Sequence, residues 1–82
     1  MILVDVYIPS VDDNFDFMLD EDTEIRKIIM EINEMISKKM KSHRIDNVND
    51  FLLYSMEQEQ MLDKEQTLYE SGIRDGSRLM LV

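Results

Sequence analysis

Residues 68–82 read LYESGIRDGSRLMLV and constrain the architecture more than any other part of the chain. Asp75-Gly76 is typical of a turn, because glycine adopts backbone angles that other residues avoid. The alternation in RLMLV that follows predicts a strand. The segment therefore predicts a compact connection, a turn and the closing strand of a small domain.

The N-terminal residues predict a hairpin. Residues 2–8, ILVDVYI, alternate as a half-buried strand does, with Ile2 pointing inward and Leu3 outward. Pro9 ends this run, because proline cannot donate a hydrogen bond to a sheet. The composition of residues 10–14, SVDDN, predicts a turn, and FDFML at 15–19 predicts the second strand.

The longest periodic signal lies between the hairpin and the middle of the chain and predicts a helix over residues 23–40. Asp22 or Thr23 is expected to cap its N-terminus, and Glu24 favours the positive end of the helix dipole. Apolar residues fall at helical spacing and predict one buried stripe, which comprises Ile25, Ile28, Ile29, Ile32, Met35 and Ile36.

The remaining residues complete an α+β order of elements. Residues 42–50 are expected to form a polar loop, 51–56 a strand and 61–62 a short strand. The inward register of 51–56 stays open, because FLLYSM is apolar on both faces: either Phe51 and Leu53 or Leu52 and Tyr54 point inward. We predict a single domain over 1–82, with a mixed sheet of four to five strands covered on one face by one long helix.

This order, over essentially the whole chain, resembles the ubiquitin-like β-grasp fold. Leu68, with Ile73 five residues later, is followed by the Asp75-Gly76 turn and a final strand, as in ubiquitin-like domains. The resemblance implies that the leucine and the isoleucine plug the open end of the roll.

Two segments are more narrowly similar to the YukD/EsaB family, small bacterial ubiquitin-like proteins associated with type VII (WXG-type) secretion. They are EIRKII at 24–29 and the pattern L…GI.DG..L.L over 68–81. The chain departs from the family in a longer helix with a polar loop to about Asp50. The connection between the third and fourth strands is also slightly longer.

Composition excludes several classes of protein. A net charge of -9 argues against binding to nucleic acid, which requires lysine and arginine to replace the phosphate counterions. No apolar run approaches the ~20 residues of a membrane span, and the N-terminus lacks the basic region of a signal peptide. The chain has no cysteine and therefore no disulfides. We expect a cytoplasmic protein, and the resemblance adds a position peripheral to a membrane secretion complex.

No pattern in the sequence predicts catalysis, a metal site or a cofactor. Asp12, Asn14 and Asp16 match the start of a calcium loop, but Phe17 occupies the position that requires glycine, and Thr23 occupies the twelfth position. His43 is the only histidine, and no serine lies in a nucleophile-elbow motif. We therefore expect a protein that is not an enzyme.

Two surfaces are candidates for binding a protein partner. The sheet face away from the helix is expected to expose an apolar set, which comprises Leu3, Tyr7, Met18, Leu52 or Tyr54 according to register, Met80 and Val82. A secondary basic patch comprises Lys38, Lys39, Lys41 and Arg44. The alternatives are an ordinary surface or a homodimer contact for the first set, and a solubilising helix end for the second.

The expected function is that of a non-catalytic accessory or regulatory protein of a type VII secretion system. The resemblance implies action through protein contacts with a component of the secretion machine. Conjugation is not expected, because the sequence ends at the β-branched Val82 without the diglycine that ubiquitin carries. The alternatives are a ubiquitin-like modifier, a sulfur carrier, and a ubiquitin-like domain of a larger membrane secretion component.

Overall fold

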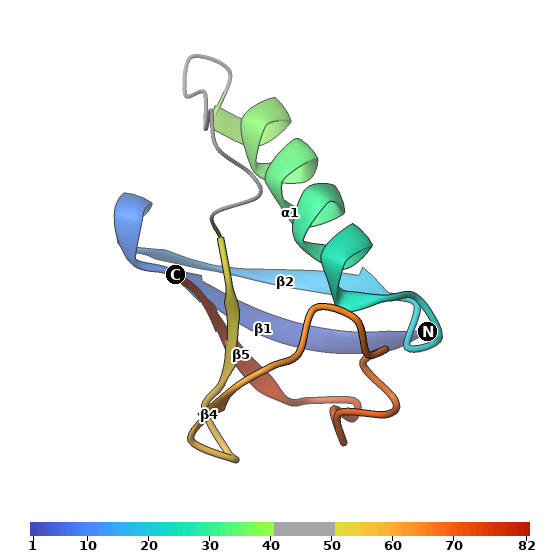
Figure 1. The fold of residues 1–82 in the computed structure, drawn as a ribbon. Helices are drawn as coiled ribbons and strands as arrows, with labels where there is room; N and C mark the ends of the chain where they lie inside the picture. The colour runs from blue at the N-terminus through green and yellow to red at the C-terminus, as the bar shows by residue number, and fades with distance from the viewer. Residues whose placement is uncertain (41–50) are drawn as a thin grey trace.

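The structure, a computed structural model, describes residues 1–40 and 51–82, and of residues 39 and 40 only the backbone. Figure 1 shows one long helix lying across one face of a twisted sheet. In chain order the elements are β1 (Ile2–Ile8), the 3-10 helix η1 (Pro9–Val11), β2 (Asp13–Leu19), α1 (Ile25–Met40), β3 (Leu53–Ser55), β4 (Gln60–Met61) and β5 (Arg78–Leu81). This arrangement confirms the predicted α+β fold.

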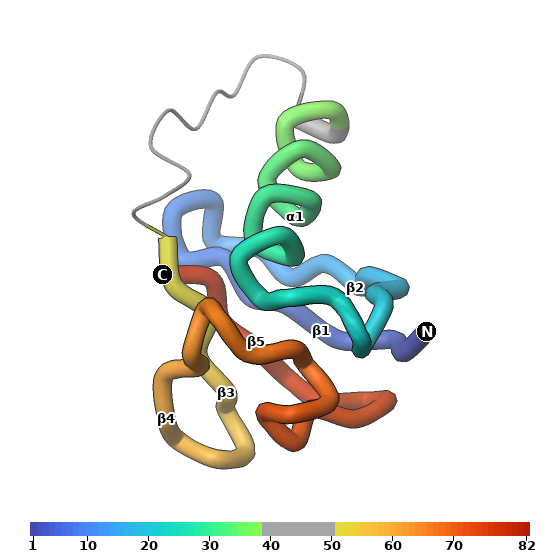
Figure 2. Tube along the Cα trace, turned by 45° about the vertical axis from the view of Figure 1, so that its right-hand side comes forward, coloured from blue at the N-terminus to red at the C-terminus, as the bar shows by residue number. Residues whose placement is uncertain are grey.

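The five strands form one mixed sheet in the order β2-β1-β5-β3-β4. The first and last strands of the chain, β1 and β5, run parallel at its centre, and the other neighbours are antiparallel. The tube in Figure 2 shows α1 in front of these strands, with the segment before β5 closing the lower end. We call the sheet face away from α1 the outer face.

The core lies between the inward face of the sheet and α1, because alternate residues of the strands and one stripe of the helix are apolar. The predicted stripe is confirmed for its five isoleucines, which are all buried, whereas Met35 is half-buried and packs against the core. Strand residues that fill the other side of this core are Ile2, Val4, Val6, Ile8, Phe17, Leu19, Leu53, Leu79 and Leu81. Alternation along β1, β2 and β5 therefore predicted their inward residues correctly, whereas the register of β3 had been left open.

The start of α1 differs from the prediction. The helix begins at Ile25, and neither Asp22 nor Thr23 caps it with a side chain. The backbone N–H of Ile25 donates to the carbonyl oxygen of Gln66 at 2.8 Å, and that of Arg26 donates to Lys64 at 3.0 Å. The connection before β5 thus satisfies free N–H groups of the first helical turn, which a side chain was expected to satisfy.

The segment before β5 closes the end of the core. Leu68 and Ile73 are fully buried, and the N–H of Ile73 donates to the carbonyl of Leu68 at 3.0 Å. Gly76 has a φ of 86°, in the left-handed region that glycine adopts without strain. Its N–H donates to the carbonyl of Leu3 at 2.7 Å, and the N–H of Leu3 donates to Oδ1 of Asp75 at 2.8 Å. The turn is therefore fastened to the start of β1.

The third strand shows which of its two possible registers occurs. Leu53 and Ser55 are buried, so the side chains of Leu52 and Tyr54 belong to the outer face. The register is fixed by pairing with β5, where Leu53 lies opposite Leu81. The short fourth strand begins one residue earlier than predicted, and β2 begins two residues earlier.

Candidate functional site

The outer face carries a row of apolar side chains that crosses four of the five strands. Tyr7 of β1 lies opposite Met80 of β5, which lies opposite Tyr54 of β3. Tyr54 in turn lies opposite Met61 of β4. Residues directly opposite one another share a face of the sheet. We call Tyr7, Met80, Tyr54 and Met61 the apolar row.

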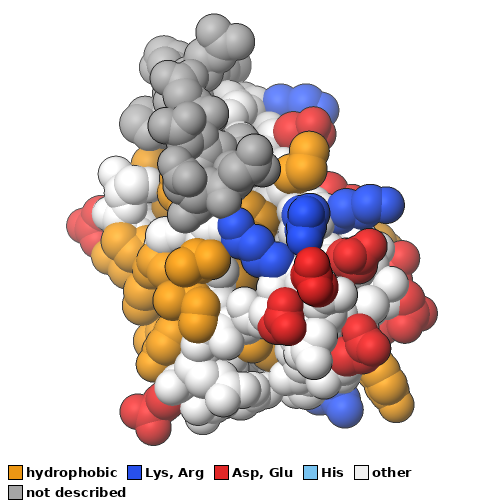
Figure 3. All heavy atoms as spheres, viewed as in Figure 1, with side chains coloured by type: hydrophobic (Ala, Val, Ile, Leu, Met, Phe, Trp, Pro, Cys, Tyr) orange, Lys and Arg blue, Asp and Glu red, His pale blue; other side chains and the backbone are white. Residues whose placement is uncertain are grey.

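The end of β5 extends this surface. The backbones of Leu52 and Val82 exchange two hydrogen bonds of 2.8 and 2.9 Å, so both residues join the sheet beside the apolar row. Both side chains are exposed. Figure 3 shows hydrophobic side chains gathered on the side of the molecule where β3 and the end of β5 lie. Five of the predicted partner-binding residues are therefore neighbours.

Leu3 and Met18, the two other predicted residues, do not belong to this cluster. They face each other across β1 and β2 and are both exposed. Asp16, Asp5 and Arg78 form a charged row that lies between this pair and the apolar row, since Asp5 pairs with both of its neighbours. The charged row thus divides the predicted apolar face into two parts. The sequence did not show this division, because alternation alone does not tell which strands become neighbours.

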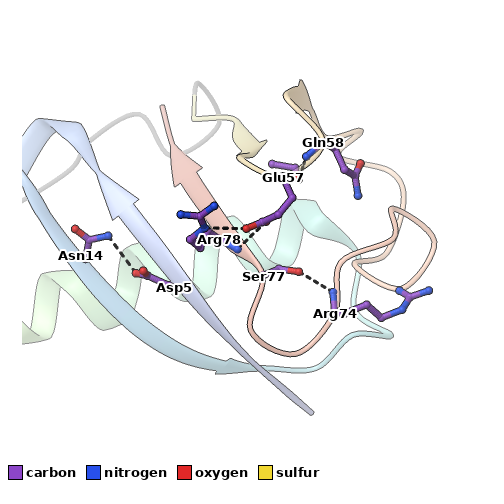
Figure 4. A network of polar contacts seen from close by, with 8 residues as sticks. Asp5, Asn14, Glu57, Gln58, Arg74, Ser77 and Arg78 are labelled. Atoms are coloured by element: carbon purple, nitrogen blue, oxygen red, sulfur yellow. Dashed lines mark hydrogen bonds and ion pairs between the residues drawn. The ribbon is translucent and has the colours of Figure 1, made fainter.

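Arg78 is the best-fixed side chain of the charged row. Its Nε and its backbone N–H each donate to the carboxylate of Glu57 at 2.9 Å, as Figure 4 shows. These hydrogen bonds, with the attraction between the two charges, lower the pKa of the Glu57 carboxyl. The side-chain hydrogen bond and the Glu57 charge raise the pKa of the Arg78 guanidinium, and the Asp5 charge also contributes.

A hollow of about 260 Å³ opens on the outer face between the apolar row and the charged row. Its walls include Asp5, Tyr7, Asn14 and Arg78, with Met56 at the end of β3. Nδ2 of Asn14 donates to Oδ1 of Asp5 at 3.2 Å, which orients the carboxylate (Figure 4). We call this depression the sheet hollow.

Tyr7 is held at the rim of the sheet hollow. Its hydroxyl donates to Oδ1 of Asp12 at 2.7 Å, and this hydrogen bond, with smaller effects of burial and of the Asp12 charge, raises the pKa of the phenol. Asp12 has a φ of 49°, which directs the chain from η1 into β2. Asp12 and Asn14, considered above for a calcium loop, thus have partners in the hairpin.

Sequence reasoning missed Met56, Met61 and Arg78 as parts of this face. Met61 was expected in a short strand, and only its pairing with Tyr54 shows that it faces outward. The N–H of Met56 donates to the carbonyl of Arg78 at 3.0 Å, which aligns it with the charged row. No local pattern could have shown either placement, because both depend on contacts between distant segments.

The secondary basic patch remains a prediction. Lys41 and Arg44 lie outside the described residues, as does His43. Lys38 is exposed near the end of α1, and only the backbone of Lys39 is described. The structure therefore does not bring these four side chains together or separate them.

One cluster within residues 1–40 and 51–82 has the spacing of metal ligands. The carboxylates of Asp20, Glu21 and Asp22 lie within 4.8 Å of one another. However, Oδ1 of Asp20 accepts the N–H of Asp22 at 3.0 Å, and Oε1 of Glu21 accepts the amino terminus of Met1 at 3.2 Å. These bonds explain the cluster as part of the turn before α1. In the described part of the chain, no helix has the length and apolarity to cross a membrane.

Solved structures of ubiquitin-like domains resemble this fold. The N-terminal ubiquitin-like domain of the 4931431F19Rik protein is 26% identical with a TM-score of 0.70, and the match covers 99% of this chain and 72% of that one. The ubiquitin-like domain of Arabidopsis thaliana protein At2g32350 is 21% identical with a TM-score of 0.73, over 99% and 74%. ATBAG1, solved in complex with HSP70, is 18% identical with a TM-score of 0.68, over 100% and 40%.

The sequence also matches a protein family. No curated protein sequence matches the chain. The profile described as "WXG100 protein secretion system (Wss), protein YukD" matches residues 3–81, which include both segments that carried the resemblance. The chain therefore belongs to the YukD family of the WXG100 protein secretion system and has a ubiquitin-like β-grasp fold.

Proposed function

We propose that this protein is a non-catalytic accessory or regulatory protein of the WXG100 secretion system. It acts by binding another protein of the machinery through the outer face and is not itself joined to a target. The apolar row, together with Leu52 and Val82 beside it, carries this proposal. Five apolar residues, Tyr7, Leu52, Tyr54, Met80 and Val82, are neighbours on a face that α1 does not cover. Clustered exposed apolar residues usually mark an interaction site.

The chemistry of the row suits recognition of a protein. Tyrosine combines a large apolar ring with a polar hydroxyl, and methionine is flexible enough to adapt to a partner. The ATBAG1 structure with HSP70 is an example of a related fold in a protein complex. The backbone of Val82 forms two hydrogen bonds with Leu52 and thus continues the sheet beside the apolar row. We place the protein in the cytoplasm, peripheral to the membrane complex of the machine.

Complementation of secretion tests this proposal. A strain that lacks the gene receives the wild-type protein or the double variant Tyr7→Glu/Met80→Glu, which puts two charges into the apolar row. The matched control is Tyr69→Glu/Met30→Glu, because both of its residues are exposed and lie outside the outer-facing strand positions. We expect the control to restore secretion of WXG100 substrates and the row variant to fail.

The row variant must first be shown to be folded by its amide NMR spectrum. If the folded row variant restores secretion fully, the outer face is not the working surface. If deletion of the gene leaves secretion unchanged, the role in the machine is wrong.

A further inference from the structure

The outer face is acidic as well as apolar. Asp5 and Asp16 occupy outward strand positions, and Asp12 and Glu57 are hydrogen-bonded to side chains of the same face. Arg78 is the only basic residue at the outward strand positions of the described chain. The outer face thus carries four carboxylates and, at its described strand positions, one guanidinium, in a protein whose net charge is -9. The charge of this face therefore favours a partner that carries positive charge.

One pair of these carboxylates is unfavourable in the free protein. Asp5 lies directly opposite Asp16 across β1 and β2, and like charges at such positions destabilise a sheet. Asp5 has the amide of Asn14 and the neighbouring charge of Arg78 to compensate. The side chain of Asp16 has no hydrogen bond or ion pair with any residue that the structure describes. The repulsion is therefore only partly relieved within the protein.

We propose that the partner presents apolar side chains beside a lysine or an arginine, and that this cation binds Asp16 and Asp5 at the edge of the sheet hollow, on the side of Asp5 away from Arg78. The apolar side chains cover Met80 and Tyr54 at the same time. This rests on the proposed function and names the chemistry of the partner. The hollow lies at the boundary of the two rows, so one segment contacts both. The cation relieves the repulsion between the two aspartates.

The same charges disfavour other occupants. A second copy that docked through this face would add its own carboxylates to those already present. Nucleic acid and anionic lipid carry negative charge and are repelled. Electrostatic complementarity of this kind selects partners and speeds association more than it adds to affinity.

The test measures stability and binding on the same variants. The probe is a short amphipathic Leu/Lys peptide, with a Leu/Glu peptide of the same pattern as its counterpart, titrated into the isotope-labelled protein by amide NMR. We expect the Leu/Lys peptide to shift resonances of β1, β2, β3 and β5 and the Leu/Glu peptide to shift none. Asp16→Asn should weaken binding about threefold at low salt, and added salt should remove the difference. Asp16→Asn should also raise the urea midpoint of unfolding.

Glu31→Gln is the matched control, because it removes the same charge from the exposed side of α1. It should leave the affinity for the Leu/Lys peptide unchanged. If Asp16 had a purely structural role, its substitution would change stability and binding in the same direction. We expect Asp16→Asn to raise stability and to weaken binding.

Any of three peptide-binding results would overturn the proposal: equal binding of the Leu/Glu peptide, shifts confined to α1, or equal affinities of Asp16→Asn and wild type. Concentration-dependent dimerisation through the outer face would identify a second copy as the occupant and would also overturn it. If any of these occurs while the Tyr7→Glu/Met80→Glu variant still fails to support secretion, the basic partner is wrong but the proposed function stands.

Discussion

Tyr54 of β3 lies directly opposite Met80 of β5 on the outer face. Met80 also lies opposite Tyr7 of β1, so a half-buried methionine occupies the register position between two tyrosines. Methionine interacts favourably with aromatic rings and changes conformation easily. Because β1, β5 and β3 each have a neighbouring strand on both sides, this group lies on strands that are paired along both edges. The centre of the proposed binding surface is therefore pre-formed.

The helix stripe should control stability. Ile32 is fully buried, whereas Glu31 is exposed on the same helix. Truncation of a buried isoleucine to alanine removes packing and leaves a cavity, so Ile32→Ala should lower the free energy of unfolding by about 2–5 kcal/mol. Glu31→Ala should change it little. Urea unfolding followed by circular dichroism compares the two, and similar midpoints would mean that the stripe is misplaced.

The turn before β5 should require glycine for its backbone conformation alone. A Cβ at Gly76 would meet no atom within 4 Å, but its φ of 86° is unfavourable for other residues. Gly76→Ala should therefore destabilise the protein by about 1 kcal/mol. Gly76→Asn should cost less, because asparagine tolerates this region better. Equal losses for the two variants would point to a cause other than backbone conformation.

The ion pair of Glu57 and Arg78 should contribute to stability in a pH-dependent way. Arg78 lowers the pKa of Glu57 below its ordinary 4.5, so the folded state favours the carboxylate. That contribution is present above the ordinary pKa and is lost as the pH falls through the lowered value. Wild type should be more stable than Glu57→Gln at neutral pH, and the difference should vanish in acid.

Urea midpoints of both proteins at about pH 7 and about pH 3 measure this difference. Glu31→Gln serves as the control for the loss of one negative charge. A difference between wild type and Glu57→Gln that is the same at both pH values would contradict the role of the ion pair.

The hydroxyl of Tyr7 should lose its proton at a higher pH than an ordinary tyrosine. Its hydroxyl donates to Asp12, which raises its pKa above the ordinary 10.0. This contribution to stability is complete below the ordinary pKa and is lost as the pH rises through the raised value. Ultraviolet titration of the three tyrosines should therefore lose its most alkaline component in Tyr7→Phe. In Asp12→Asn the same component should move to lower pH, and an unchanged titration curve would exclude the hydrogen bond in solution.

Much of the fold could be predicted because the spacing of apolar residues along the chain identifies its helix and several of its strands. The alternation of residues 2–8 and the isoleucine spacing of α1 each state which side faces the core. The register of β3 could not be predicted, since Leu52, Leu53 and Tyr54 are all apolar. Pairing with β5, which lies more than 20 residues later in the sequence, selects Leu53 as the inward residue.

The candidate site could be predicted only in outline, for the same physical reason. Alternation identifies which residues point outward, but the neighbours across the sheet depend on topology. The parallel pairing of β1 with β5 brings Arg78 beside Asp5 and thereby separates Leu3 from Tyr7's apolar neighbours. The predicted cap of α1 was wrong for the same reason, since it too depends on a distant segment. Backbone carbonyl groups of residues 64 and 66 accept the first helical N–H groups in place of a local side chain.

Photocrosslinking in the native host tests most directly whether the outer face binds a protein. A photoreactive amino acid is placed at Met61, at the exposed end of the apolar row, or at Met30 on the exposed side of α1. The two sites are matched, because both are exposed methionines. We predict that irradiation links the Met61 variant to one protein of the secretion machinery and leaves the Met30 variant unlinked. Crosslinks to that machinery from Met30 and none from Met61 would contradict the account.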